Sequence, residues 1–351
     1  MLPVPVLEQA REEFLSYADA GASVLEISHR GGPFVDILAT TKQRLIDLLK
    51  IPESHELLFL QGGSRLQFSM VPMNLLRGQP QPADYILTGS WGQMAAAEAR
   101  REGPVRVAWD GGATDYDRWP ASEALKLTSG AAYVHFTSNE TIQGVQFPSE
   151  PNVGTSPLVC DASSDFLGRP LPVEQYGLIY ACAQKNAGPA GVTVVIIRKD
   201  LLERCSADLP GYCNYKSHVD NDSCYNTPPT FGVYLVGLVA KWLQEDVGGL
   251  AAMLQRNQQQ ARLLYDVIDQ SDGFYAGHAQ RRSRSLMNVI FRLPNDELQR
   301  KFIDQAAEHQ LCNLKGHRSV GGIRASIYNA MPLEGVQTLC EMMVQFQKQY
   351  A

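Results

Sequence analysis

Residues 158–197, LVCDASSDFLGRPLPVEQYGLIYACAQKNAGPAGVTVVII, decide the fold of this chain. They contain three short apolar runs, at 158–160, 177–181 and 192–197, each bounded by glycine, proline or small polar residues. Runs of this length and with these boundaries are typical of strands that are buried on both faces of a sheet. We therefore expect an α/β protein.

Two ionisable residues, Asp161 and Lys185, follow the first two of these strands. In open α/β sheets, ligands bind at the edge formed by the carboxyl ends of the strands. A desolvated lysine amine can form a Schiff base with an aldehyde, and a carboxylate can pair with the pyridinium nitrogen of pyridoxal phosphate. The alternative is that the two side chains form a structural ion pair or lie apart on solvated loops, and this stretch alone leaves both interpretations open.

The length of 351 residues favours one large and one small domain. The formal net charge of −6 argues against a general nucleic-acid binder. No apolar stretch reaches the roughly 18–20 residues of a membrane span, and the N-terminus shows no signal peptide. The seven cysteines include no C-x-x-C pair, so we expect reduced thiols in the cytoplasm and no disulfide or metal site.

Apolar spacing predicts the remaining elements. We expect helices over 4–20, 34–50, 66–76, 93–101, 231–245, 250–268, 296–309 and 333–350. We expect further strands over 24–27, 57–60, 85–88, 131–136 and 287–292, and an irregular segment over 104–130. The helix over 250–268 is long enough to bridge two domains, so we place a large domain at residues 1–255 and a small one at 256–351.

Other polar residues are expected near the same sheet edge. The strand, small-residue turn and helix around Ser64 and Arg65 form an arrangement in which backbone N–H groups can hold a phosphate, although an ordinary turn has the same pattern. Trp91 follows a strand and could stack on a flat cofactor ring or belong to the core. Thr141 follows another strand and could equally be a plain turn threonine.

Two glycine-flanked basic stretches are candidate anion sites. One is His29-Arg30, and the other runs from Lys315 to Arg324 and includes His317 and Arg318. Arg324 begins an apolar run that would hold its guanidinium rigid, as recognition of a carboxylate by two hydrogen bonds requires. Solvated basic loops are the alternative.

Taken together, these stretches resemble the phosphoserine aminotransferase family, class V aminotransferases of the fold-type I pyridoxal-phosphate enzymes. The resemblance extends from about residue 2 to the C-terminus. Its most specific parts are Ser28-His29-Arg30, Phe59-Leu60-Gln61-Gly62-Gly63, Pro72-Met73-Asn74-Leu75, Asn139-Glu140-Thr141, Ala183-Gln184-Lys185-Asn186, Tyr225-Asn226-Thr227-Pro228-Pro229, and the stretch from Lys315-Gly316-His317-Arg318 through Ala330-Met331-Pro332.

The resemblance implies a large domain with a mostly parallel seven-stranded sheet flanked by helices, and a smaller α+β C-terminal domain. It implies that Lys185 binds pyridoxal phosphate and later moves a proton, while Asp161 pairs with the pyridinium nitrogen. It further implies that Trp91 stacks on the ring, that Thr141 bonds its phenolic oxygen, and that Ser64, Arg65 and Gln184 hold its phosphate together with Asn226 and Thr227 of a partner subunit.

The resemblance also implies the substrates. Arg324 would bind the α-carboxylate, and His29 and Arg30, with His317 and Arg318 of the partner, would bind the distal anion of phosphoserine or glutamate. The implied reaction transfers the amino group between glutamate and 3-phosphohydroxypyruvate in serine biosynthesis, in a homodimer that shares its active sites. The same pocket would also accept 4-phosphonooxy-threonine, which links it to vitamin B6 synthesis.

Two alternatives remain at this point. One is another class V aminotransferase that acts on a non-phosphorylated amino acid, against which the basic residues argue. The other is a non-catalytic paralogue that binds pyridoxal phosphate. It is suggested by one departure from the family, whose members usually carry a segment resembling Phe-Ser-Ala-Gly-Pro ahead of the Met-Leu-Pro that stands here at residues 1–3.

Overall fold

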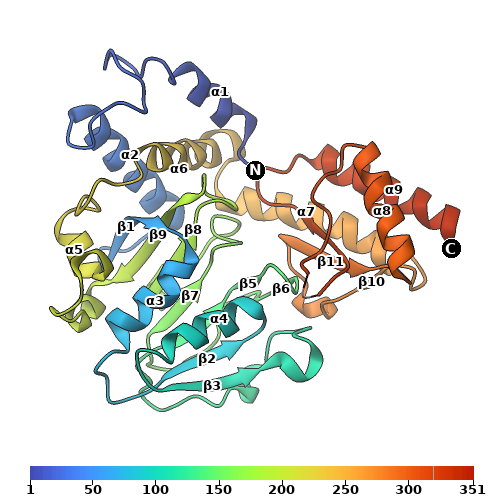
Figure 1. Cartoon of the computed structure of the whole chain (residues 1–351), viewed down its shortest axis with the longest axis horizontal. Helices are drawn as coiled ribbons and strands as arrows, with labels where there is room; N and C mark the ends of the chain where they lie inside the picture. Colours follow the sequence, from blue (N-terminus) through green and yellow to red (C-terminus); the bar gives the residue numbers. More distant parts are fainter. Residues whose placement is uncertain (319) are drawn as a thin grey trace.

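The computed structural model describes residues 1–318 and 320–351, and its largest element is a seven-stranded sheet (Figure 1). Only one of these strands, β9, runs antiparallel to its neighbours, so the expected mostly parallel sheet is confirmed. Their order is β1 (His55–Gly62), β9 (Gly191–Arg198), β8 (Leu178–Cys182), β7 (Leu158–Asp161), β4 (Val134–Thr137), β2 (Ala83–Leu87) and β3 (Val105–Asp110).

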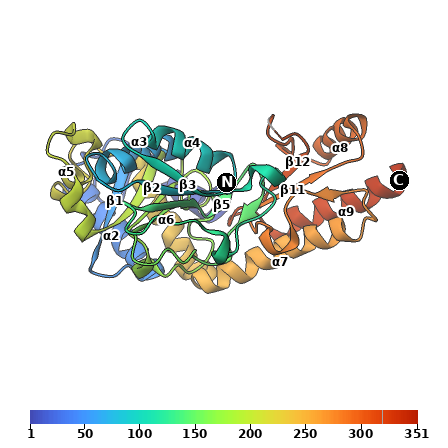
Figure 2. The same cartoon turned by 90° about the horizontal axis from the view of Figure 1, so that it is seen from below.

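Helices cover both faces of this sheet, which explains the apolar character of its strands (Figure 2). Successive residues point to opposite faces, so that Val159 packs in one core and Cys160 in the other. One face is covered by α1 (Val4–Glu12), α2 (Gly32–Leu49) and α6 (Thr230–Trp242). The other is covered by α3 (Ser64–Leu75), α4 (Ser90–Ala99) and α5 (Tyr215–Asp220).

A third core lies in the C-terminal part, which the long helix α7 (Leu250–Asp269) joins to the sheet (Figure 1). Phe291, Phe302 and Phe346 pack there with ring centroids 5.8 and 5.2 Å apart. This part contains β10 (Ala276–Gly277), β11 (Asn288–Arg292), α8 (Asp296–Glu308), β12 (Ile323–Ser326) and α9 (Leu333–Tyr350). We propose residue 255 as the boundary between the two domains, since the third core begins at Ala261.

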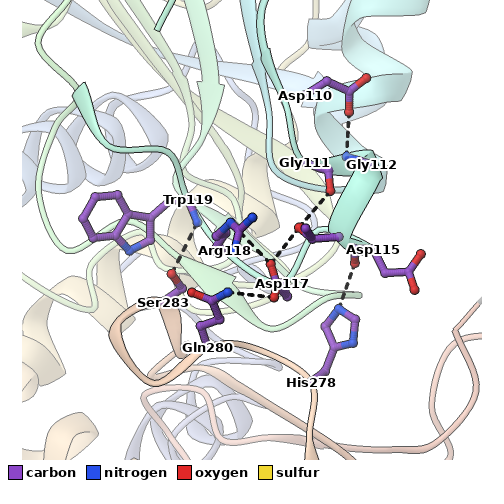
Figure 3. A network of polar contacts seen from close by, with 11 residues as sticks. Asp110, Gly111, Gly112, Asp115, Asp117, Arg118, Trp119, His278, Gln280 and Ser283 are labelled. Carbon is purple, nitrogen blue, oxygen red and sulfur yellow. Dashed lines mark hydrogen bonds and ion pairs between the residues drawn. The ribbon is translucent and has the colours of Figure 1, made fainter. Parts of the chain in front are cut away.

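Polar contacts join the two parts at the end of β3 (Figure 3). The backbone N–H of Gln280 donates to the Asp117 carbonyl at 2.8 Å, and its side-chain amide donates to the Asp117 carboxylate at 2.9 Å. His278 Nε2 lies 2.9 Å from the Asp115 carbonyl oxygen. The N–H of Trp119 donates to Ser283 Oγ at 3.3 Å, so the loop after β3 is fixed against the C-terminal part.

Three expectations about local structure are wrong. The first helix ends at Glu12 rather than near residue 20, because the apolar side chains beyond it lie in turns, where Phe14 and Tyr17 contact Phe231 and Tyr234 of α6. Residues 24–27 form a turn. The segment over 104–130 contains the edge strand β3.

None of the helices in the described part of the chain is both long enough and apolar enough to span a bilayer.

Candidate active site

A pocket of about 270 Å³ opens at the carboxyl edge of the sheet. Residues from five different segments line it, and these segments lie at strand ends, at helix starts or just after a strand. They include Ser64, Arg65, Trp91, Thr141, Asp161, Gln184 and Lys185, the cofactor residues predicted from this chain's own side of the site, together with Gly63, Thr137, Asn139, Ser163, Ser164 and Cys182.

The amine of Lys185 lies inside this pocket. Lys185 follows β8 in a turn that the hydrogen bond from Ala187 N to the Ala183 carbonyl (3.0 Å) closes. Its Nζ donates to Thr141 Oγ1 at 2.9 Å and lies 5.5 Å from the centroid of the Trp91 ring. The amine is thus held at a defined point between a hydroxyl and an aromatic face.

Asp161 is the last residue of β7, and its carboxylate is buried. The backbone N–H of Ser163 donates to Asp161 Oδ1 at 3.0 Å. Burial raises the pKa of Asp161, while hydrogen bonds from Ser163 and the charge of Lys185 lower it. Because desolvation is the largest influence, a cationic partner in the pocket would stabilise this carboxylate.

At the N-terminus of α3, no side chain of the described residues caps the first N–H groups. The N-cap is Gly63, and Gly62 before it has φ = +91°, which favours glycine. Ser64 Oγ lies 2.6 Å from Ser163 Oγ, so the turn is attached to the segment that follows Asp161. An uncapped helix N-terminus that faces a pocket is suited to bind a phosphate.

The N-terminus of α4 is capped by Glu140, a residue for which the sequence predicted no role. The N–H groups of Trp91 and Gly92 donate to the Glu140 carboxylate at 3.0 and 2.9 Å. Burial raises the pKa of Glu140 to about 7, although these two hydrogen bonds lower it. Among the described residues, the buried indole N–H of Trp91 has no hydrogen-bond partner.

Arg324 lies outside this pocket and lines a second cavity of about 480 Å³ in the C-terminal part. A buried amide contact nevertheless links its strand, β12, to the site. Asn139 Nδ2 donates to Asn288 Oδ1 at 2.9 Å, and Asn288 Nδ2 donates to Ser326 Oγ at 3.0 Å. The strand that carries Arg324 is therefore fixed relative to Asn139, which lies in the pocket lining close to Thr141.

The other predicted residues do not line the pocket of this single chain. Asn226 and His29 are partly exposed, and Arg30, Thr227, His317 and Arg318 are exposed. The Thr227 carbonyl accepts a hydrogen bond from Gln61 Nε2 at 2.7 Å, so this loop lies at the end of β1. The chain by itself brings together the cofactor residues predicted from its own side, whereas Asn226, Thr227 and the residues predicted for the distal anion lie outside the pocket.

The pocket fits pyridoxal phosphate. Its lysine amine could carry the aldehyde carbon, its buried carboxylate suits a pyridinium nitrogen, and the Trp91 ring offers a flat face. The uncapped start of α3 suits a phosphate. Within residues 1–318 and 320–351, no cluster of three or more His, Cys, Asp or Glu side chains could hold a metal ion.

Comparisons with known proteins agree with this geometry. The aminotransferase class-V family model matches residues 1–339. The phosphoserine aminotransferase of Rhodopirellula baltica is 57% identical over 346 residues, which cover 98% of this chain and 92% of that protein. The structure of the Bacillus circulans subsp. alkalophilus phosphoserine aminotransferase superposes with a TM-score of 0.97 at 46% identity, over 100% of this chain and 97% of that one.

A further solved structure shows the cofactor in a relative. It is the pyridoxal-phosphate-bound phosphoserine aminotransferase of Trichomonas vaginalis, which is 40% identical, with a TM-score of 0.92 over 98% of this chain and 97% of that one. The chain therefore belongs to the class V aminotransferases, and among these pyridoxal-phosphate-dependent enzymes to the phosphoserine aminotransferase family.

Proposed function

We propose that this protein transfers the amino group of glutamate to 3-phosphohydroxypyruvate, forming O-phosphoserine and 2-oxoglutarate. The proposal rests on the position of the Lys185 amine, which Thr141 fixes beside the Trp91 ring. It is supported by the 57% identity of the chain to a phosphoserine aminotransferase. The reaction runs in two halves. Both halves use one pocket, because glutamate and phosphoserine each carry an α-carboxylate and a second anionic group.

When bound, pyridoxal phosphate supplies an electron-accepting ring that stabilises negative charge at the substrate Cα. Lys185 would hold the cofactor and then act as the base and acid that moves the Cα proton. Asp161 would keep a proton on the pyridine nitrogen, and Trp91 would stack on the ring. The start of α3, with Ser64 and Arg65, would hold the phosphate.

We propose that the active enzyme is a homodimer. Asn226 and Thr227 of the partner subunit would complete the cofactor phosphate site, and His317 and Arg318 of the partner subunit would bind the distal anion together with His29 and Arg30. Surface composition supports an interface, because large apolar side chains concentrate at the surface of one segment. Within residues 1–35 they are Met1 (60% exposed), Val4 (64%), Leu7 (49%), Phe14 (43%), Leu15 (85%), Leu25 (48%) and Val35 (52%).

Arg318 tests the substrate class. Arg318→Ala should raise KM for phosphoserine by about 10- to 100-fold, the loss expected for a hydrogen bond to a charged group, and should leave KM for alanine unchanged. Arg300→Ala removes another exposed arginine, on α8, and controls for the change in net charge. Equal effects on phosphoserine and alanine would favour a class V enzyme for non-phosphorylated amino acids.

Mixed dimers test the shared site. Lys185→Ala and Asn226→Ala subunits, each impaired alone, should recover activity when they are unfolded and refolded together, because one of the two sites in a mixed dimer is then intact. No recovery beyond the sum of the two variants would contradict sharing. Cytoplasmic location and a role in vitamin B6 synthesis stay predictions, the former supported by seven cysteines that are all free thiols.

A further inference from the structure

Glu140 ends the short strand β5 (Asn139–Glu140) and is completely buried beside the pocket. Its two carboxylate oxygens accept separate hydrogen bonds, Oε2 from the N–H of Trp91 and Oε1 from the N–H of Gly92. Both donors belong to the first turn of α4, 49 and 48 residues earlier in the chain. A single side chain thus fixes the backbone of the residue whose ring faces Lys185.

Glu140 packs so closely against the start of α4 that there is no room for a side chain at the N-cap residue, Gly89. A Cβ at Gly89, the N-cap of α4, would lie 2.5 Å from Glu140 Cδ and 2.7 Å from its Cγ. Gln143 supports the same turn, since its Oε1 accepts the N–H of Ser90 at 3.3 Å and its Nε2 donates to Ser90 Oγ at 2.8 Å. Segment 140–143 therefore holds the first three residues of α4.

The two helix N-termini at this pocket, those of α3 and α4, differ in how their backbone N–H groups are capped. No side chain in the described part of the chain caps the start of α3, whereas the Glu140 carboxylate caps the start of α4. Because a helix N-terminus attracts anions, Glu140 leaves α3 as the site for a phosphate. Glu140 also directly precedes Thr141, whose hydroxyl accepts a hydrogen bond from the Lys185 amine, so one segment contacts both the backbone of Trp91 and the amine.

We propose that Glu140 is a positioning residue that sets the Trp91 ring at the distance at which it stacks on the cofactor. This inference rests on the proposed function and deepens it. Glu140 acts through the α4 backbone and does not touch the reacting atoms. Burying a carboxylate is costly, and the cost is incurred here next to Lys185 and Asp161, where ring position matters for chemistry.

The test uses Glu140→Gln, which keeps the side-chain length and one carbonyl oxygen but turns an amide N–H₂ toward the second backbone donor. We expect affinity for pyridoxal phosphate, measured by titrating the cofactor-free enzyme, to fall about tenfold. In the cofactor-free protein, hydrogen–deuterium exchange at the amides of Trp91 and Gly92 should become faster.

Asp84→Asn is the matched control. Asp84 is equally buried and also accepts two hydrogen bonds, from Thr128 N at 2.5 Å and Thr128 Oγ1 at 2.9 Å, but it lies at the start of β2, away from the pocket. We expect Asp84→Asn to lower the melting temperature and to leave cofactor affinity within twofold. A purely structural role for Glu140 would give the two variants the same cofactor affinity, and that result would overturn the proposal.

A double-mutant cycle identifies the route of the effect. If Glu140 acts through Trp91, Glu140→Gln should cost almost no further cofactor affinity in a Trp91→Ala background. An undiminished loss there would refute the inference. All of these measurements use cofactor binding or amide exchange, so they stay decisive even if the wild-type enzyme binds pyridoxal phosphate but does not accept phosphoserine, the result that would refute the proposed function alone.

Discussion

His135 should make the stability of this protein fall as the pH drops below neutral. The residue lies in β4, where its side chain is 1% exposed. Its Nε2 lies 2.9 Å from the Tyr180 hydroxyl, and its ring stacks on Tyr85 at a centroid distance of 4.7 Å. Burial lowers the pKa of His135 to about 3, because desolvation disfavours the charged imidazolium.

The sign and the size of this change in the free energy of unfolding follow from the linkage between protonation and folding. In the unfolded chain a histidine has a pKa near 6.5, so between pH 6.5 and 3 the unfolded state binds a proton that the folded state does not. The contribution of His135 is therefore present above pH 6.5 and is lost progressively as the pH falls. Between pH 7 and pH 5 the loss amounts to about 2 kcal/mol.

The assay compares the wild type with His135→Gln, whose side chain can still hydrogen-bond Tyr180 but does not titrate. Urea unfolding followed by circular dichroism at pH 7 and pH 5 gives the change in unfolding free energy for each protein. Other buried histidines, such as His55 and His218, are present in both and cancel. We expect the wild type to lose about 2 kcal/mol more than the variant. Parallel losses would show that His135 does not stay neutral in the fold.

Substitutions at three further residues test the site. Asp161→Asn should leave the cofactor bound but lower kcat about a hundredfold or more, measured by steady-state kinetics, because the pyridine nitrogen loses its anionic partner; a loss under fivefold would remove Asp161 from this role. Trp91→Ala should weaken cofactor binding about 5- to 100-fold in a spectrophotometric titration while Trp91→Phe retains most of it, and equal losses would argue against stacking. Arg324→Lys should raise KM for both glutamate and phosphoserine, since a lysine cannot make the paired hydrogen bonds of a guanidinium; a change for only one substrate would contradict binding of the shared α-carboxylate.

The central sheet could be predicted because its strands are buried on both faces and are therefore apolar throughout. The edge strand β3 could not, since among the described residues it pairs only with β2, and the exposed Arg106 interrupts its apolar run. Conversely, the apolar run over 24–27 resembles a strand in sequence but forms a turn. The local pattern of apolar residues therefore indicates which residues are buried, and indicates only indirectly which segments pair as strands.

The same distinction applies to the site. The positions of Asp161 and Lys185 could be predicted because Asp161 ends one recognisable strand and Lys185 lies three residues after another, and parallel strands bring their ends together. The role of Glu140 could not be predicted, because its hydrogen-bond partners lie 48 and 49 residues earlier in the chain. Neither segment contains a sequence signal that the start of α4 contacts this carboxylate. Its one visible signal is its place beside Thr141 at the sheet edge.

The most direct test of the proposed function follows the visible absorption of the enzyme reconstituted with pyridoxal phosphate. Addition of glutamate should abolish the visible band of the bound cofactor in a single turnover, and one equivalent of 3-phosphohydroxypyruvate should restore it, while glyoxylate or pyruvate should not. Restoration by glyoxylate or pyruvate at the same rate would contradict a site built for a phosphorylated substrate. A band that glutamate leaves unchanged would contradict transamination itself.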